Sequence, residues 1–287
     1  MCYNETYVSN RNIGCNMEVI KSKENNTVKH IRSLYKRKYR EKYGEYVVEG
    51  VRAVRDLLRK KKIHTICIAV SQVSSSAIIE IIELANAHHC IVHLIEDRIF
   101  SAIEQTVQGQ GILAIANKDE YALHTVVPEK EIYLVLDRIQ DPGNLGTIIR
   151  TAVSADVKGV ILTKGSVDPY NEKCIRSTMS AISEIPIYDN IDEQEVIQFI
   201  QKFSLHSYVT ALERAVTYDS LTYTVPAVLI MGNEANGVSQ KLQDACDHRI
   251  VIPIIGNIES LNLAVATGIC LYKMRESFYH ESPKESI

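Results

Sequence analysis

Three short apolar runs, each followed at once by polar residues, constrain the fold of this 287-residue chain more than any other feature. They cover residues 132–136, 227–231 and 250–255. Such a run is typical of a strand that is buried on both faces of a parallel sheet. The carboxyl ends of parallel strands meet at one edge of the sheet, where open α/β folds bind their ligands. We therefore expect a binding site at these three strand ends.

Residues 131–287 are predicted to form one α/β domain, because strand and helix patterns alternate along them. The predicted strands are residues 132–136, 159–162, 184–188, 207–211, 227–231 and 249–253, and the predicted helices are residues 145–155, 170–180, 192–202, 240–245 and 261–276. This order implies a parallel sheet. Periodicity alone favours a plain doubly wound sheet, because deep knots are very rare.

Residues 20–117 are predicted to form a second, smaller α/β domain. The elements expected there are a basic helix at 20–46, helices at 50–60, 76–87 and 97–104, and strands at 46–48, 65–70, 91–94 and 111–116. Residues 118–130 are polar, contain Pro128 and are interpreted as a linker. Residues 1–19 lack a periodic pattern, so we expect a disordered leader. Met17 begins a stretch that looks more like a natural start of the protein.

Positive charge is concentrated near the beginning of the chain. Residues 21–62 hold fifteen Lys and Arg against five Asp and Glu, whereas the whole chain has a net charge of −3. Such a block is the expected footprint of a nucleic-acid contact, although a solvated helix face would look the same. The candidate nucleic-acid ligands are Lys29, Arg32, Lys36, Arg37, Lys38 and Arg40.

Three tyrosines recur every four residues within this basic stretch, at Tyr35, Tyr39 and Tyr43. Tyrosines among cations can stack on the bases of a nucleic acid. They can equally anchor a helix to its own domain. The sequence leaves both interpretations open.

Other patterns exclude several classes of protein. No apolar run approaches the length of a membrane span, and the first twenty residues hold no signal-peptide core, so we expect a cytoplasmic protein. The seven cysteines include no C-x-x-C pair and are expected to be reduced. We interpret the cluster His88, His89, Cys90 and His93 as a helix end and expect no metal site. The glycine fingerprints of dinucleotide and nucleoside triphosphate sites are absent.

The polar residues at the three strand ends form three motifs. The first is Asn144-x-Gly146-x-x-x-Arg150, the second is Gly232-Asn233-Glu234, and the third is Ile252-Pro253 followed by Ser260-Leu261-Asn262. Together they resemble the three motifs of the SpoU/TrmH branch of the SPOUT RNA methyltransferases. The resemblance covers about 160 residues closely. It implies a trefoil knot within residues 228–272.

Three pieces of the smaller domain resemble the substrate-binding domain found in front of many SpoU enzymes. They are Ser22-Lys23-x-Asn25, Tyr46-Val47-Val48-Glu49-Gly50 and Gln110-Gly111-Ile112-Leu113-Ala114. That domain resembles a small ribosomal protein in fold and contacts RNA.

The resemblance also implies the cofactor and the site residues. S-adenosylmethionine would bind at Met231, Gly232, Asn233, Gly237, Ile252, Pro253 and Leu261. The catalytic candidates are Asn144, Arg150, Glu234, Ser260 and Asn262. The reaction implied is methyl transfer to a ribose 2′-hydroxyl of structured RNA, most plausibly 23S ribosomal RNA, by a homodimer.

Local chemistry suggests a role for some of these residues. Asn144 follows a turn and is predicted to cap the next helix. Arg150 lies off the apolar stripe of that helix and is either a surface residue or a site residue. In the family the matched arginine is proposed to assist deprotonation. An arginine stays protonated, so we favour binding of phosphate and of the developing alkoxide. Glu234 could instead cap the helix that starts near Ser239.

Four other functions remain to be weighed. A transfer-RNA 2′-O-methyltransferase or an antibiotic-resistance ribosomal RNA methylase would share these motifs. A non-catalytic RNA-binding assembly factor would share the fold, but the intact set of catalytic candidates argues against it. A nucleotide-dependent dehydrogenase would need a glycine fingerprint that the sequence lacks.

Overall fold

The computed structural model describes residues 19–106 and 109–278, which form two compact units. One unit contains the described residues up to Asp119 together with Tyr170–Arg176. The other contains Glu120–Pro169 and the described residues from Ser177 onward. The sequence did not predict that residues 170–176 belong with the first unit. No helix in the described ranges has the length and apolar character needed to cross a membrane.

The first unit is built on a mixed sheet, which has five strands among the described residues. In spatial order they are β1 (Val19–Ile20), β4 (Ile91–Ile95), β3 (Ile63–Ala69), β5 (Ile112–Asn117) and β2 (Glu45–Glu49). β5 runs antiparallel to both of its neighbours, and the remaining pairs are parallel. The short strand β1 was not predicted, and Val19 had been assigned to the leader. The rest of that leader, residues 1–18, lies outside the described residues.

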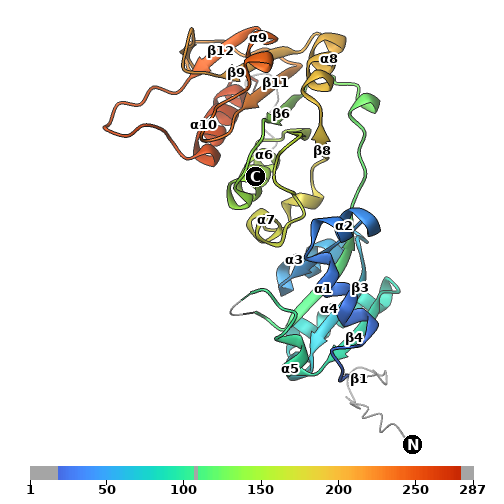
Figure 1. Cartoon of the computed structure of the whole chain (residues 1–287). Helices are drawn as coiled ribbons and strands as arrows, with labels where there is room; N and C mark the ends of the chain where they lie inside the picture. Colours follow the sequence, from blue (N-terminus) through green and yellow to red (C-terminus); the bar gives the residue numbers. More distant parts are fainter. Residues whose placement is uncertain (1–18, 107–108, 279–287) are drawn as a thin grey trace, which may run out of the picture. The chain divides into compact units, whose positions relative to one another are not determined.

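Helices cover this sheet (Figure 1). They are α1 (Asn26–Leu34), α2 (Arg37–Tyr43), α3 (Val51–Arg59), η1 (Val70–Gln72), α4 (Ser76–Ala87) and α5 (Asp97–Phe100). Val28, Ile31 and Leu34 of α1 join Phe100 in a buried cluster against the sheet. α3 packs against β5 and α4. The predicted apolar stripe of the basic helix therefore faces the core.

The predicted helix over 20–46 is in fact two helices, separated at Tyr35 and Lys36. The Tyr35 hydroxyl lies 2.8 Å from the carbonyl oxygen of Ile103 and 2.9 Å from Oε1 of Glu49. Arg40 is only 3% exposed, and its guanidinium donates a hydrogen bond to the carbonyl oxygen of Leu34 at 2.7 Å. That carbonyl ends α1 and would otherwise be an unpaired helix-terminal acceptor. Tertiary contacts thus overrode the continuous helical pattern.

The second unit is built on a sheet that has seven strands within the described ranges, and every strand pair in it is parallel. In spatial order they are β10 (Val216–Thr217), β12 (His248–Val251), β9 (His206–Thr210), β11 (Ala227–Met231), β6 (Ile132–Leu136), β7 (Gly159–Thr163) and β8 (Ile187–Ile191). The predicted parallel sheet is confirmed. The two-residue strand β10 was missed, and the predicted strand at 184–188 begins three residues too early.

The helices of this unit are η2 (Leu123–Thr125), α6 (Pro142–Ser154), η3 (Ala181–Ser183), α8 (Glu193–Phe203), α9 (Gln240–Asp244) and α10 (Leu263–Glu276). A further helix, α7 (Glu172–Thr178), has its first five residues in the first unit and its last two in this one. α8 and α9 share a buried cluster with one face of the sheet. α10 packs against α6 and contacts β11. Arg275 of α10 donates to the carbonyl oxygens of Ala155 and Asp156 at 2.8 and 2.7 Å, so the end of α10 is fastened beyond the end of α6.

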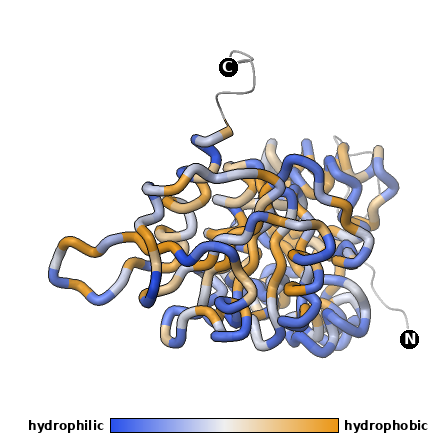
Figure 2. Tube along the Cα trace, turned by 90° about the horizontal axis from the view of Figure 1, so that it is seen from above, coloured by the Kyte–Doolittle hydropathy of each residue, from blue (hydrophilic) through white to orange (hydrophobic). Residues whose placement is uncertain are grey.

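The segment between β12 and α10, residues 252–262, reaches away from the sheet (Figure 1). Apolar and polar stretches alternate along it (Figure 2). Ile255 is 98% exposed and Ile258 is 62% exposed, which is unusual for isoleucine. We call this segment the third-motif loop. The knot that the resemblance implies for this part of the chain stays a prediction.

Candidate active site

The three motifs start from neighbouring parts of one sheet edge. β11 pairs with β6, and β12 lies next but one to β11, with β9 between them. All of these strands are parallel, so their carboxyl ends share an edge. The three strand ends therefore share one edge, as predicted, but the strands of the second and third motifs are not direct neighbours, because β9 lies between β11 and β12.

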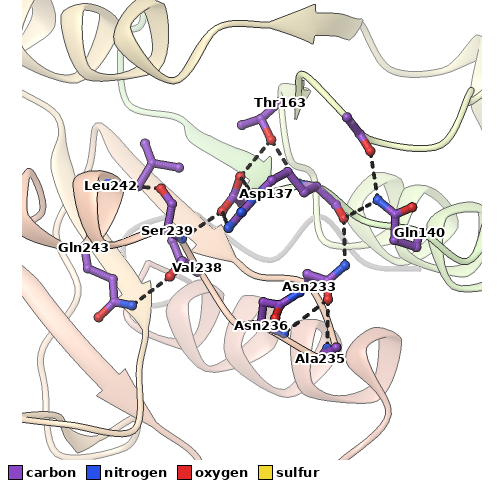
Figure 3. A network of polar contacts seen from close by, with 12 residues as sticks. Asp137, Gln140, Thr163, Asn233, Ala235, Asn236, Val238, Ser239, Leu242 and Gln243 are labelled. Atoms are coloured by element: carbon purple, nitrogen blue, oxygen red, sulfur yellow. Dashed lines mark hydrogen bonds and ion pairs between the residues drawn. The ribbon is translucent and has the colours of Figure 1, made fainter.

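Asp137 follows β6 directly and is fully buried, with 0% exposure. Its carboxylate accepts hydrogen bonds from the Thr163 hydroxyl at 2.8 Å, from the Ser239 backbone N–H at 2.8 Å and from Arg138 Nη2 at 2.9 Å (Figure 3). A buried carboxylate needs such partners, since an unpaired one is very costly. Asp137 thereby joins the ends of β6 and β7 to the start of α9. The hydrogen bond to Asp137 raises the pKa of Arg138.

Arg138 has a φ of 55°, and its backbone carbonyl points toward the second motif. This carbonyl accepts hydrogen bonds from Asn233 Nδ2 at 2.9 Å and from Gln140 Nε2 at 2.8 Å (Figure 3). The Asn233 side-chain oxygen in turn accepts from the backbone N–H groups of Ala235 and Asn236. The side-chain oxygen of Asn233 therefore closes a turn, and its side-chain nitrogen joins that turn to Arg138, just after β6.

Residues 232–239, which we call the second-motif loop, turn back sharply on themselves. The backbone N–H of Gly237 donates to the carbonyl of Asn233 at 2.8 Å, and Gly237 has a φ of 64°. A Cβ atom at Gly232 would lie 2.2 Å from both the carbonyl carbon of Gly237 and the nitrogen of Val238. Position 232 therefore requires glycine, because backbone atoms occupy the space of any side chain.

A chain of side-chain hydrogen bonds joins all three motifs. Asn144 Nδ2 donates to Glu234 Oε1 at 2.7 Å, and Asn262 Nδ2 donates to Asn144 Oδ1 at 2.9 Å. We call Asn144, Glu234 and Asn262 the polar triad. The Asn262 side-chain oxygen also accepts from the backbone N–H groups of Ala264 and Val265, so it caps α10. Three catalytic candidates thus lie within hydrogen-bond distance of one another.

One prediction about a helix cap was wrong, and the alternative of a cap by Glu234 does not hold. Asp141, and not Asn144, caps α6, because the Asp141 carboxylate accepts from the Asn144 backbone N–H at 2.7 Å and the helix begins at Pro142. Proline suits the first position of a helix, which placed the cap three residues earlier than predicted. Ser239 caps α9 through its own hydroxyl, and Glu234 is bonded to Asn144 instead.

The remaining candidates are not joined to the triad. Arg150 is exposed on α6; its backbone carbonyl accepts from the Ser154 hydroxyl, and its side chain forms no hydrogen bond or ion pair with the described part of the chain. Ser260 and Pro253 are exposed, whereas Ile252 and Leu261 are half-buried. Met231 is buried at the end of β11. Among the described residues, the third-motif loop is hydrogen-bonded to the second-motif loop only indirectly, because Asn262 bonds to Asn144 and Asn144 bonds to Glu234.

The basic candidates of the first unit have different environments. Lys29 pairs with Glu24, and Arg37 pairs with Glu41. Arg32, Lys36 and Lys38 are exposed. Arg40 is buried and holds the junction of α1 and α2, so it does not fit the predicted role in binding nucleic acid.

Sequence reasoning missed Asp137, Thr163 and the Ser239 backbone as parts of the site. Asp137 and Thr163 each occur where a buried apolar run ends, and that position at the ligand-binding edge of a parallel sheet was a usable signal.

Cysteine chemistry is disfavoured in this unit. Burial raises the pKa of Cys246 and of Cys270 to about 12, so both thiols stay protonated at neutral pH.

The geometry defines an α/β protein with an open polar site at the carboxyl edge of its parallel sheet. Residues 131–272 match the model of the SpoU rRNA Methylase family, and residues 25–114 match the MRM3-like substrate binding domain. The chain belongs to the SpoU rRNA methylase family, and the resemblance found in the sequence is confirmed.

Relatives match over nearly the whole chain. The chain is 30% identical to the 23S rRNA (guanosine(2553)-2′-O)-methyltransferase RlmP of Bacillus subtilis, over 90% of this chain and 100% of that protein. It is also 30% identical to an uncharacterized tRNA/rRNA methyltransferase of Synechocystis, over 89% of this chain and 93% of the relative.

Solved structures agree with this assignment. The AdoMet-bound rRNA methyltransferase from Sinorhizobium meliloti is 31% identical and has a TM-score of 0.82, covering 93% of this chain and 99% of its own. The fold is also similar to that of the SpoU methyltransferase AviRb from Streptomyces viridochromogenes, which is 22% identical with a TM-score of 0.79. The fold class predicted from the sequence is therefore confirmed as that of SpoU/TrmH SPOUT methyltransferases.

Proposed function

We propose that this protein transfers a methyl group from S-adenosylmethionine to a ribose 2′-hydroxyl of ribosomal RNA. The observation that carries the proposal is the polar triad, in which Asn144, Glu234 and Asn262 from three motifs form one hydrogen-bonded chain. A packing role alone does not require this arrangement, because Glu234 and Asn262 are both exposed. Exposed, mutually oriented polar groups at a sheet edge suit the positioning of a polar substrate.

The second- and third-motif loops fit an adenosine-containing cofactor. Among the described residues, the backbone groups of 252–261 form no hydrogen bonds, and Ile254, Ile255 and Ile258 of this loop are exposed. Apolar walls with a few main-chain donors and acceptors suit a flat nucleoside. Gly232, Ile252 and Leu261 would hold the cofactor, together with Met231, Asn233, Gly237 and Pro253. S-adenosylmethionine supplies a methyl group that is already activated by a positively charged sulfur.

The protein must then position the hydroxyl and favour loss of its proton. Arg150 carries an exposed guanidinium, so it binds a neighbouring phosphate and stabilises the developing alkoxide. Glu234 is held by Asn144 through one carboxylate oxygen. It orients the ribose or the guanidinium, and Ser260 and Asn262 help to position the substrate.

Ribosomal RNA is the substrate class that the relatives favour. RlmP and two relatives named RlmB, from Photorhabdus laumondii and Nitrosomonas europaea, are 23S rRNA 2′-O-methyltransferases by name. The first unit matches a substrate-binding domain and carries exposed cations on α1 and α2. We assign RNA binding to Lys29, Arg32, Lys36, Arg37 and Lys38, and we place the enzyme in the cytoplasm with its ribosomal substrate.

A homodimer is the assembly we propose. Val265 and Tyr272 of α10 are 52% and 51% exposed, and Ile255 and Ile258 of the third-motif loop are more exposed still. A second copy of this chain would cover these side chains and bring its own Arg150 to the site. Mixing Arg150→Ala chains with Glu234→Ala chains should restore part of the activity. If the two variants exchange subunits and form dimers but regain no activity, Arg150 acts in the site of its own chain.

The deciding experiment is to map ribose methylation in ribosomal and transfer RNA from cells with and without this gene. We expect one missing mark in 23S rRNA in the deletion strain, restored by the wild-type gene and not by Arg150→Ala. If the mark is instead missing from transfer RNA, then transfer RNA and not ribosomal RNA is the substrate. Unchanged marks, with no binding of S-adenosylmethionine by calorimetry, would favour the non-catalytic assembly factor.

A further inference from the structure

Helix α2 presents two tyrosine rings side by side. Tyr39 and Tyr43 are four residues apart, so they lie on one face of the helix. Their rings are nearly parallel, at 12°, with centroids 6.2 Å apart. Tyr43 is 44% exposed and Tyr39 is half-buried. We call these two residues the tyrosine pair.

Each ring of the tyrosine pair has an exposed lysine beside it. Lys38 Nζ lies 6.0 Å from the centroid of Tyr39, and Lys42 Nζ lies 5.0 Å from that of Tyr43. Neither lysine forms an ion pair with any residue that the structure describes. The surface therefore combines aromatic area with uncompensated positive charge.

Tyr35 shows what a structural tyrosine looks like in the same stretch of sequence. Its hydroxyl is bonded to Glu49 and near the Ile103 carbonyl, and burial raises its pKa. The hydroxyls of Tyr39 and Tyr43, in contrast, make no hydrogen bond to the described residues. Tyr35 thus anchors the helix to its own domain, as one interpretation predicted, whereas the hydroxyls of the tyrosine pair do not.

Contacts with neighbouring residues hold the tyrosine pair in place. The His30 ring meets Tyr43 edge to face, with centroids 4.9 Å apart at 74°. His30 Nε2 lies 2.5 Å from Glu45 Oε2 on β2, which fixes the imidazole. Gly44, with a φ of 66°, ends α2 just beyond Tyr43. A surface already fixed in position loses little conformational entropy when a ligand binds.

We propose that the tyrosine pair binds an unpaired nucleotide of the RNA substrate. The base stacks on an exposed tyrosine ring, and Lys38 and Lys42 contact the phosphates on either side. Bases in a duplex are covered by their neighbours, whereas bases in loops and bulges expose their faces to aromatic side chains. The inference rests on the proposed function and narrows its substrate to RNA with an unpaired nucleotide outside the candidate active site.

The test uses the full-length protein and two RNA probes: a hairpin with 2-aminopurine in its loop and a blunt duplex of the same length. We expect Tyr43→Ala to weaken hairpin binding about five- to a hundredfold and to abolish the change in 2-aminopurine fluorescence. Duplex binding should change less than about twofold, because phosphate contacts carry it. Tyr43→Phe should behave as wild type, since stacking needs the ring and not the hydroxyl.

Tyr121→Ala is the matched control, because Tyr121 is 42% exposed but belongs to the second unit. It should leave both affinities unchanged. Equal losses for hairpin and duplex in Tyr43→Ala, or no loss, would overturn the proposal for the tyrosine pair. Failure of the wild-type protein to methylate ribosomal RNA would instead overturn the proposed function, so the two failures are distinguishable.

Discussion

Two loops of the candidate active site differ in how the chain holds them. The second-motif loop is fastened through Asp137, Asn233 and its own backbone, and Gly232 is packed against Gly237. The third-motif loop has no backbone hydrogen bonds over 252–261 within the described ranges, and Ile254, Ile255 and Ile258 are exposed. One half of the site is therefore preorganised in a single chain, and the other half is left for a ligand or a second copy to order.

The largest expected effect comes from Arg150, which lies on neither loop. Arg150→Ala should lower the rate of methyl transfer about 10²-fold or more, because a donor to the developing alkoxide is lost. S-adenosylmethionine affinity should stay within about twofold, since the role proposed for the guanidinium is toward the substrate and not the cofactor. Single-turnover methylation and calorimetric titration of the cofactor measure the two quantities. Wild-type turnover in this variant would remove Arg150 from the mechanism.

Glycine substitutions compare the two loops directly. Gly232→Ala should destabilise the protein by about 1–3 kcal/mol, because the new methyl meets backbone atoms at 2.2 Å. Gly256→Ala in the third-motif loop should change stability by less than about 0.5 kcal/mol, since nothing lies within 4 Å of its Cβ position. Urea denaturation measures both. Equal effects at the two glycines would contradict the contrast between the loops.

Asn262 links the third-motif loop, through Asn144, to Glu234 of the second-motif loop. Asn262→Ala should cost about 0.5–2 kcal/mol, because the cap of α10 is lost along with the link to Asn144. Asn262→Ser restores a capping oxygen but is too short to reach Asn144, so it should recover most of the stability and little of the turnover. Thermal unfolding and methylation assays separate these effects. If Asn262→Ser regained full turnover, the polar triad would have no role in positioning.

The smallest expected effect is on amide hydrogen exchange, and not on stability or on the rate of methyl transfer. Backbone amides of the second-motif loop should exchange slowly with solvent deuterium, because Gly237 and Ser239 donate to protein acceptors. Amides over 254–261 should exchange quickly in the free protein and slow when S-adenosylmethionine is added. Hydrogen exchange followed by mass spectrometry reads both loops in one sample. Slow exchange of 254–261 without cofactor would show that this loop is also preorganised.

Local patterns predicted the elements of the fold well. Apolar runs at 132–136 and 227–231 became β6 and β11 with unchanged bounds, because a strand buried on both faces is specified by its own residues. The basic helix was predicted less well. Its break at Tyr35 depends on Glu49, Ile103 and Arg40, whose contacts form only when the unit folds.

The sequence by itself determined the parallel sheet, the three motifs at its edge and the family to which the chain belongs. Only the tertiary structure decided which side chains pair. Asn144 and Glu234 are 90 residues apart, Asp137 and Ser239 are 102 apart, and Asn144 and Asn262 are 118 apart. The physical reason is that periodicity reports neighbours along one element. Contacts between strand ends depend instead on the spatial order of the strands, which places β11 between β9 and β6.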